Sequence, residues 1–129
     1  MKITHAIYLV DDEAAALEFL GELLGFELMS EDFTVDGTRF VTVRVSGESG
    51  LHLQVVETPL QSRISELKKK AGVVDFILEV GDISSICKKI EARGMTIVRN
   101  PTEAPYGITA IFEDPFGNLW DIVERSVPD

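Results

Sequence analysis

The sequence predicts an α+β fold that consists of two consecutive βαβββ modules. Segments that alternate apolar and polar residues, as half-buried strands do, surround two segments whose apolar residues recur at helical spacing. One strand, one helix and three further strands are expected in the first half of the chain, and the same order is expected in the second half. Corresponding residues of the two halves lie 69 or 70 positions apart: His5 and Asp75, Asp12 and Asp82, Gly25 and Gly94, His52 and Asp121.

The length and the charge of the chain limit its possible functions. A chain of 129 residues is sufficient for a core, so residues 1–129 are expected to form a single domain. The net charge of −10 argues against binding to nucleic acid, which requires a basic surface. No apolar run reaches the roughly 20 residues of a membrane span. The single cysteine, Cys87, is expected in a helix core and fits a reducing, cytoplasmic location.

The first module is expected to begin with a strand and a capped helix. Asp11 or Asp12 can cap the N-terminus of this helix, and Gly25 can end it. The dipeptide Asp36-Gly37 is a strong signal for a hairpin between two of the strands that follow. The four strands expected in this module are residues 3–10, 26–35, 38–46 and 51–57, with a loose loop at residues 46–50.

The second module is expected to repeat this order after a linker. Pro59 ends the preceding strand, and residues 61–71 have the composition of a short helix. Asp82 can cap the second long helix, and Gly94 can end it. The strands expected in this module are residues 73–80 and the segments MTIVR, GITAIFED and LWDIVE, with the loop NPTEAPYG between the first two of these segments.

The modules are therefore expected at residues 1–58 and 73–126, and residues 59–72 are expected to be the helical linker that joins them. The offset between the two copies falls from 70 to 69 within the helix: the cap aspartate and the final glycine are thirteen steps apart in the first copy and twelve in the second. We therefore expect two copies of one supersecondary unit, related by a pseudo-twofold axis and differing by one helical residue.

The segment IFEDPFGNLWDIVE, residues Ile111–Glu124, predicts the last hairpin of the chain. Pro115 fixes φ in the turn, while Gly117 and Asn118 tolerate a positive φ. The return strand carries one carboxylate, Asp121, among apolar residues. The direction in which this carboxylate points is therefore important for function.

Strand alternation places four potential metal ligands on one face of the predicted sheets. Neighbouring side chains of a strand point to opposite faces, so residues that alternate with buried apolar positions share the other face. If each sheet has its helix on the outside, the inner face carries both histidines of the chain. The four residues expected on this inner face are His5, His52, Asp75 and Asp121.

The chemistry of these four side chains suits a divalent cation. Imidazole nitrogen and carboxylate oxygen are ligands that Zn²⁺, Ni²⁺, Mn²⁺ and Fe²⁺ accept. A divalent metal ion is therefore the expected cofactor. The alternative interpretation is that the four residues are polar side chains on the solvated face of an open sheet.

The two modules resemble the vicinal oxygen chelate superfamily, which includes glyoxalase I, methylmalonyl-CoA epimerase, extradiol dioxygenases and the fosfomycin and bleomycin resistance proteins. The resemblance covers nearly the whole chain. It rests mainly on the segments THAIYLVDDEAAALEFLGELLGFEL and APYGITAIFEDPFGNLWDIVE. It implies that each module folds into a U-shaped mixed sheet with its helix outside, and that two modules form an open cleft. Catalytic members of the family hold one divalent metal in that cleft.

The resemblance also implies which residues bind the metal. The first and fourth strands of the first module supply His5 and His52, and those of the second module supply Asp75 and Asp121. Glu is usual at the position of Asp121. His52 stands where the family usually has Glu or Gln, and Asp75 stands where its metalloenzymes usually have His.

A metal-dependent enzyme is the first functional hypothesis. The metal would chelate two neighbouring oxygens of a small substrate while a carboxylate moves a proton, in a reaction of lyase, isomerase or dioxygenase type. Glu79, which shares a strand face with Asp75, is the candidate base. Asp121 would take part in catalysis as a ligand of the metal ion. Arg44 and Tyr106 are candidates for binding the substrate.

The alternative hypothesis is a metal-free protein that binds or sequesters a small molecule, as the resemblance to bleomycin resistance proteins implies. The net charge of −10 suits a cationic ligand. Asp75, Glu79 and Asp121 would then form an anionic lining. In both hypotheses the partner is a small molecule, and the exposed strand edges favour a homodimer.

Overall fold

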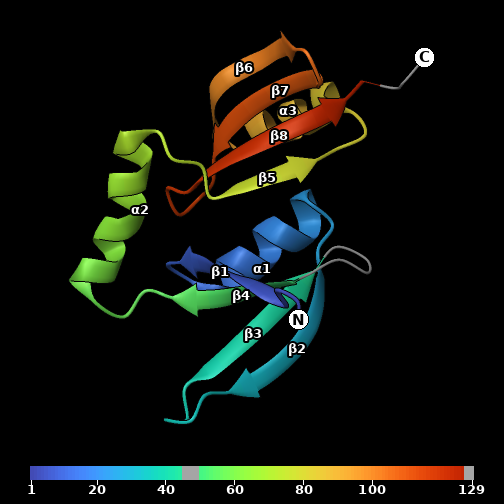
Figure 1. The fold of residues 1–129 in the computed structure, drawn as a ribbon. Coiled ribbons are helices and arrows are strands. Elements are labelled where there is room, and N and C mark those ends of the chain that lie inside the picture. The colour runs from blue at the N-terminus through green and yellow to red at the C-terminus, as the bar shows by residue number, and fades with distance from the viewer. Residues whose placement is uncertain (45–49, 127–129) are drawn as a thin grey trace. The chain divides into compact units, whose positions relative to one another are not determined.

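The structure is a computed structural model that describes residues 1–44 and 50–126 (Figure 1). It divides into two compact units, Met1–Ser62 and Arg63–Asp129. Each unit contains one open, four-stranded mixed sheet, as expected for two βαβββ modules. Most of the loop predicted at residues 46–50 lies outside the described residues, and Gly50 already belongs to a strand.

The sheet of the first unit has the strand order β1-β4-β3-β2. The outer strand β1 pairs with β4 in parallel, and the other two pairs are antiparallel. The predicted hairpin at Asp36-Gly37 connects β2 to β3, and Gly37 has a φ of +87°. The elements of this unit are β1 (His5–Val10), α1 (Glu13–Glu18), the π-helix η1 (Phe19–Leu23), β2 (Glu27–Phe33), β3 (Arg39–Arg44) and β4 (Gly50–Val55).

The first helix changes its winding before it ends. Asp12 is the N-cap, because its Oδ1 accepts a hydrogen bond of 2.9 Å from the amide of Ala15. After Glu18 the chain continues as the π-helix η1, a form whose backbone hydrogen bonds enclose one residue more than those of an α-helix. Gly25 follows with a φ of +75°, as expected for the residue after a helix.

One face of the first sheet packs against this helix. Tyr8 and Val10 of β1 are buried together with Phe19 and Leu20 of η1. The alternate residue Ile7 is 57% exposed, so it lies on the face that points away from the helix. This outcome agrees with the predicted alternation, which places His5 on the same face as Ile7.

The second unit repeats this arrangement, with the strand order β5-β8-β7-β6. The outer strand β5 pairs with β8 in parallel, and α3 lies across one face of the sheet (Figure 1). Within α3, Cys87 and Ile90 are buried, which confirms Cys87 as a core residue. The elements of this unit are β5 (Phe76–Glu79), α3 (Ile83–Ala92), β6 (Thr96–Ala104), β7 (Gly107–Glu113) and β8 (Leu119–Arg125).

The second long helix is a regular α-helix from its cap to its end. Asp82 is the N-cap, and its Oδ1 accepts a hydrogen bond of 3.1 Å from the amide of Ser85. Gly94 follows the helix with a φ of +78°. Both capping aspartates and both terminal glycines therefore have the predicted roles.

Strand β6 is longer than predicted, and the expected loop NPTEAPYG is wrong for most of its length. The strand extends to Ala104 and includes Pro101. Proline is tolerated there because β6 is an edge strand, and because its pairing with β7 is irregular between Arg99 and Thr102. The sequence pattern does not distinguish an edge strand with a bulge from a loop.

The turn between β7 and β8 is held by the buried carboxylate of Asp114. Its Oδ1 accepts hydrogen bonds of 2.9 Å from the amides of Phe116 and Asn118, and its Oδ2 accepts one of 3.0 Å from Nε1 of Trp120. The predicted hairpin is thus confirmed. Trp120, the bulky residue beside Asp121, is oriented into the core with 1% of its surface exposed.

Helix α2 (Pro59–Ala71) connects the two units and begins with a proline, which suits the first position of a helix. Its buried residue Ser65 donates a hydrogen bond of 2.6 Å to Oδ1 of Asn118, so the helix is attached to the β7–β8 turn. No helix within residues 1–44 and 50–126 has the length and apolar character needed to cross a membrane.

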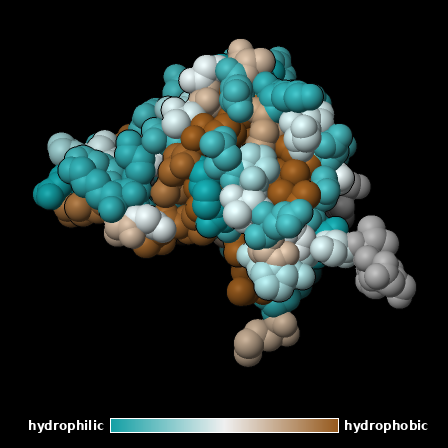
Figure 2. Space-filling model, turned by 90° about the horizontal axis from the view of Figure 1, so that it is seen from above, coloured by the Kyte–Doolittle hydropathy of each residue, from teal (hydrophilic) through white to brown (hydrophobic). Residues whose placement is uncertain are grey.

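Apolar side chains also reach the surface, where brown patches lie among polar residues (Figure 2). Ile77 in β5 is 69% exposed, and it lies 70 positions after Ile7, which is 57% exposed. Both residues are on the sheet face that points away from the helix of their unit. Each unit therefore presents an apolar residue on the face that carries its candidate ligands.

Candidate functional site

The two histidines of the chain lie close together on the first sheet. His5 in β1 is opposite Gly50 in β4, and His52 is opposite Ile7, so both imidazoles are on the face away from the helix. A Cβ added to Gly50 would lie 3.0 Å from Cδ2 of His5 and 2.8 Å from Cγ2 of Thr42. The missing side chain of Gly50 therefore leaves the space in which the ring of His5 lies.

Both imidazoles are positioned by neighbours. Nδ1 of His5 is 3.0 Å from Oγ1 of Thr4, which leaves Nε2 as the nitrogen available to a ligand. The ring of His52 stacks on Phe40, with 4.3 Å between the centroids and 8° between the planes. Phe40 lies two residues before Thr42, the cross-strand partner of His52, so the two rings are diagonal neighbours.

The environment of His52 favours its neutral form. Burial of the imidazole lowers the pKa of His52 from its ordinary value of 6.5, and the electrostatic interaction with His5 lowers it further. The neutral form is the one that binds a metal ion.

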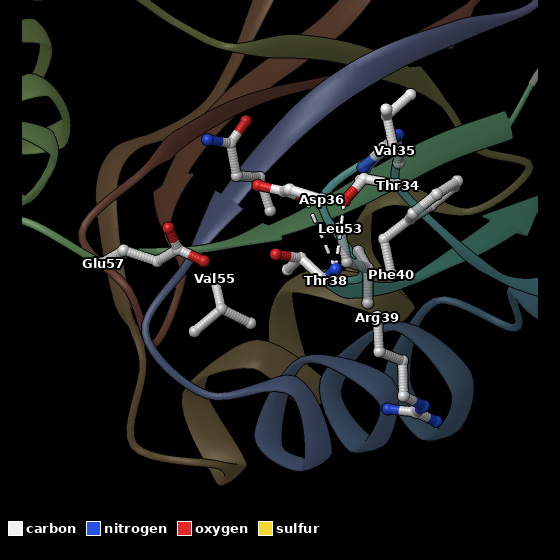
Figure 3. Close-up of a pocket in the computed structure, with 11 residues that line it drawn as sticks. Thr34, Val35, Asp36, Thr38, Arg39, Phe40, Leu53, Val55 and Glu57 are labelled. Atoms are coloured by element: carbon white, nitrogen blue, oxygen red, sulfur yellow. Dashed lines mark hydrogen bonds between the residues drawn. The ribbon is translucent and has the colours of Figure 1, made fainter.

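His52 also lines a hollow in the first unit with a volume of about 640 Å³ (Figure 3), the larger of the two hollows that contain candidate ligands. The β2–β3 turn forms one side of this hollow, where Asp36 accepts hydrogen bonds from the hydroxyl of Thr34 and the amide of Thr38. Two carboxylates, those of Asp36 and Glu57, are among the lining residues. The hollow therefore combines an aromatic pair with acidic side chains.

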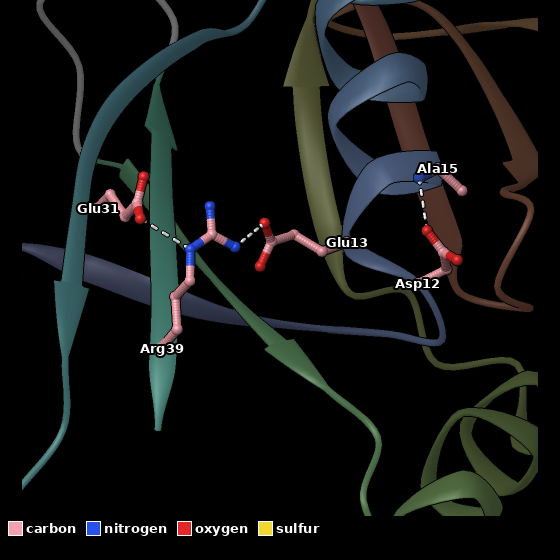
Figure 4. A network of polar contacts seen from close by, with 5 residues as sticks. All are labelled: Asp12, Glu13, Ala15, Glu31 and Arg39. Carbon is pink, nitrogen blue, oxygen red and sulfur yellow. Dashed lines mark hydrogen bonds and ion pairs between the residues drawn. The ribbon is translucent and has the colours of Figure 1, made fainter. Parts of the chain in front are cut away.

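Arg39, the cation in this lining, is engaged elsewhere. Its Nε donates a hydrogen bond of 2.8 Å to Oε1 of Glu31, and its Nη1 contacts Oε1 of Glu13, as Figure 4 shows. The two carboxylates balance the guanidinium charge. The hollow consequently has an acidic character that would favour a cation.

In the second unit, Asp75 has one oxygen in an ion pair and one without a partner. The amide of Asp75 donates to the carbonyl of Leu119 at 2.8 Å, which fixes the residue beside β8. Nζ of Lys68 donates a hydrogen bond of 2.7 Å to Oδ1 of Asp75. Its Oδ2 is buried and has no hydrogen-bond partner among the described residues.

Asp121 has the same unusual feature. It lies in β8 opposite Ile77, and its Oδ1 is buried without a hydrogen-bond partner within the described chain. Asp121 lines a hollow of about 250 Å³ together with Tyr106, Thr109 and Arg125. A buried carboxylate oxygen without a partner is costly, and an unseen cation or water would explain it.

The other predicted residues have different surroundings. Glu79 is 61% exposed, and its Oε1 accepts a hydrogen bond of 2.9 Å from Nε of Arg125. Tyr106 lines the same hollow as Asp121. Arg44 is half-buried at the end of β3, and the larger hollow lies at the other end of that strand.

The candidate ligands therefore form two pairs, one in each unit. No three His, Cys, Asp or Glu side chains within the described ranges are grouped closely enough to hold a metal ion. Each pair fits a divalent cation in its chemistry, because one offers imidazole nitrogen and the other offers carboxylate oxygen that has no hydrogen-bond partner among the described residues. Neither pair is a complete set of ligands by itself.

Three residues that contact these side chains were not predicted from the sequence. Phe40 stacks on His52, Lys68 pairs with Asp75, and Arg125 pairs with Glu79. Strand alternation alone puts Phe40 on the face of His52, but the register of β3 against β4 is needed to make them neighbours. No local sequence signal indicates the partners of Lys68 or Arg125.

Comparison with known proteins places this fold in a family. The family model for the Glyoxalase/Bleomycin resistance protein/Dioxygenase superfamily matches residues 2–122. The uncharacterized protein YurT of Bacillus subtilis is 31% identical over an aligned length of 129, in an alignment that covers 97% of this chain and 100% of that protein. A probable lactoylglutathione lyase of Synechocystis sp. is 27% identical over 128 residues, which cover 98% of this chain and 97% of that protein.

A solved structure shows the same fold. The crystal structure of TnmS3, an antibiotic binding protein from Streptomyces sp. CB03234, matches with a TM-score of 0.74 and 24% identity. The match covers 98% of this chain and 97% of TnmS3. Because the family model extends over nearly the whole chain, this protein belongs to the glyoxalase/bleomycin resistance protein/dioxygenase superfamily.

Proposed function

We propose that the protein is a metal-dependent enzyme of the glyoxalase type that acts on a small oxygenated substrate as a lyase or isomerase. A divalent ion would be held by His5 and His52 from one unit together with Asp75 and Asp121 from the other. The two pairs can come from one chain or from two copies of it. The observation that carries the proposal is the buried oxygen on each of the two aspartates that has no hydrogen-bond partner in the described part of the chain.

Further features support the histidines as ligands. Nδ1 of His5 is engaged by Thr4, as is usual for the second nitrogen of a metal-binding histidine. His52 is biased towards its neutral form by burial and by His5, which lower its pKa. The similarity to a probable lactoylglutathione lyase over 98% of the chain supports a lyase.

The residues of this chain would supply orientation and proton transfer. When bound, a divalent ion supplies Lewis acidity towards two neighbouring substrate oxygens. Tyr106 would contact the substrate from the hollow that it shares with Asp121. Glu79 would accept a proton, and its ion pair with Arg125 holds one of its oxygens in place. Arg44 stays a candidate for binding the substrate.

Metal analysis of the purified, untagged protein tests the proposal. We expect one divalent ion per site in the wild-type protein and its loss in the variant His5→Ala/His52→Ala, because two nitrogen ligands are removed. The variant Asp75→Asn/Asp121→Asn should also lose the ion. Glu18→Gln changes an exposed carboxylate of α1 and is the matched control, which should retain it.

The proposal is wrong if the wild-type protein contains no metal and added Zn²⁺, Ni²⁺, Mn²⁺ or Fe²⁺ does not raise its melting temperature. The same sample, sized by sedimentation, tests the homodimer that we propose as the functional form. The exposed Ile7 and Ile77 and the unpaired edges of β2 and β6 support such association. A monomer at all concentrations would remove the dimer from the proposal.

Metal-free sequestration of a small cationic molecule is the second candidate function. The larger hollow favours it, because Phe40 offers an aromatic ring there and Asp36 and Glu57 offer negative charge. TnmS3, an antibiotic binding protein, has the same fold. Saturable binding of a cationic aromatic compound to metal-free protein, weakened by Phe40→Ala but not by His5→Ala, would favour this function over the enzyme.

A further inference from the structure

We propose that Lys68 limits the affinity of the cation site, because its ammonium group is a resident monovalent cation on Asp75 that a divalent ion must share or displace. The inference rests on the proposed function, since it takes Asp75 as a metal ligand. It adds a residue outside the four candidate ligands and predicts that the chain limits its own affinity for metal.

The contact between the two side chains is short and partly shielded. Nζ of Lys68 is 2.7 Å from Oδ1 of Asp75, within the range of a charge-assisted hydrogen bond. The side chain of Asp75 is only 12% exposed, whereas that of Lys68 is 45% exposed. The carboxylate is therefore largely shielded from solvent, and the lysine side chain is the more exposed partner of the pair.

The helix that carries Lys68 is held in place by contacts at two points. One turn before Lys68, Ser65 donates its buried hydrogen bond of 2.6 Å to Asn118. The carbonyl of Lys68 accepts a hydrogen bond of 2.9 Å from the amide of Val73, which lies two residues before Asp75. Hydrogen bonds therefore hold the chain in place both before and after Lys68, and they position its side chain near Asp75.

The neighbouring lysines have other partners. Nζ of Lys70 is 2.8 Å from Oε1 of Glu66 one turn earlier on the same helix, and Lys69 is 3.5 Å from Glu113. Neither of these carboxylates is a candidate ligand. Lys68 and Lys70 thus have the same charge and make contacts of similar length, but of these two only Lys68 contacts a candidate ligand.

The pair has a direct consequence for cation binding. Oδ1 of Asp75 already accepts a hydrogen bond from Lys68, whereas the buried Oδ2 has no partner among the described residues and is the oxygen that an ion would contact. A divalent ion bound at Oδ2 would share one carboxylate with the ammonium group, and the two cations would repel each other. A neutral residue at position 68 would remove this repulsion and make Asp75 a stronger ligand.

Isothermal titration of chelator-treated, full-length protein with Zn²⁺ and Ni²⁺, at one pH and ionic strength, tests the inference. Lys68→Gln keeps a donor for Asp75 without the charge and should bind the ions about tenfold more tightly than the wild type. Lys68→Arg keeps the charge and should stay within about twofold of the wild type. Lys70→Gln is the matched control and should leave the affinity unchanged.

Each outcome is decisive. If the wild type binds the ions and Lys68→Gln does not bind them more than about twofold more tightly, the role of Lys68 is overturned. The proposed metal site is unaffected by that result. Binding to Lys68→Gln alone supports the role of Lys68 and overturns the proposed function of the natural protein. Binding to none of the proteins overturns both. Lys68→Met is a second neutral variant, and the melting temperature of each variant confirms that it is folded.

Discussion

The helices of the two units differ by one residue, and the structure shows where this residue is accommodated. The first helix begins as α1 and ends as the π-helix Phe19–Leu23, whereas α3 is a regular α-helix from Ile83 to Ala92. A π-helical turn is the usual form in which a helix contains one extra residue. The comparison shows that the insertion is absorbed within the helix, before the following strands begin.

This absorption preserves the positions of the candidate ligands. Gly25 and Gly94 both follow their helices with a positive φ, so the chain leaves each helix in the same way. His52 in β4 and Asp121 in β8 then lie in strands that pair in parallel with the first strand of their own units. The repeat is therefore structural, although one unit offers imidazoles and the other offers carboxylates.

The comparison of the helices leads to the prediction with the largest effect. Deleting Gly21 should convert the π turn to an α turn and cost about 1 kcal/mol of unfolding free energy, because the insertion is removed where it is accommodated. Deleting Lys88 should cost about 4 kcal/mol, because it rotates the buried Ile90 by about 100° away from the core. Urea unfolding of both variants measures the difference.

Equal costs for the two deletions would contradict this account of the π-helix. A deletion of the exposed Glu103 in the edge strand β6 shows how much a shortened strand costs in the same assay. Circular dichroism of the two helix variants verifies that each still contains its helices.

The helix caps should differ less between the units. Asp12→Ala and Asp82→Ala should each cost about 1 kcal/mol of unfolding free energy, because each removes the acceptor for one amide of the first turn. Asp12→Asn and Asp82→Asn keep an acceptor and serve as controls. Thermal unfolding would argue against equivalent caps if one alanine variant lost stability and the other did not.

The smallest expected effect is a pH dependence that belongs to the first unit. Burial and the electrostatic interaction with His5 lower the pKa of His52 in the folded protein. As the pH falls through 6.5, the ordinary pKa of histidine, the imidazole therefore binds a proton more readily in the unfolded chain than in the folded protein. The contribution of His52 to stability is therefore complete above that value and decreases as the pH falls through it. Urea unfolding between about pH 7.5 and about pH 5.5, with chelator present, measures this loss.

His52→Gln should have a weaker pH dependence over the same range, because the titrating group is absent. Its unfolding free energy should fall less on acidification than that of the wild type. An identical fall in both proteins would assign the dependence to other groups.

Much of the fold follows from local patterns in the sequence. Asp12 and Asp82 cap helices, Gly25 and Gly94 end them, and the turn at Asp36 joins two strands as predicted. These features depend on a few neighbouring residues and on backbone geometry. The extent of β6 was not predictable, because Pro101 signals a loop unless the strand is known to lie at the edge of the sheet.

The same distinction applies to the candidate site. Strand alternation alone assigned His5, His52 and Asp121 to the sheet face that points away from the helix, since successive side chains of a strand point in opposite directions. Only the tertiary structure decided that Phe40 stacks on His52 and that Lys68 occupies one oxygen of Asp75. Such contacts join segments whose register and approach are set by the packing of the whole unit, and no short stretch of sequence encodes them.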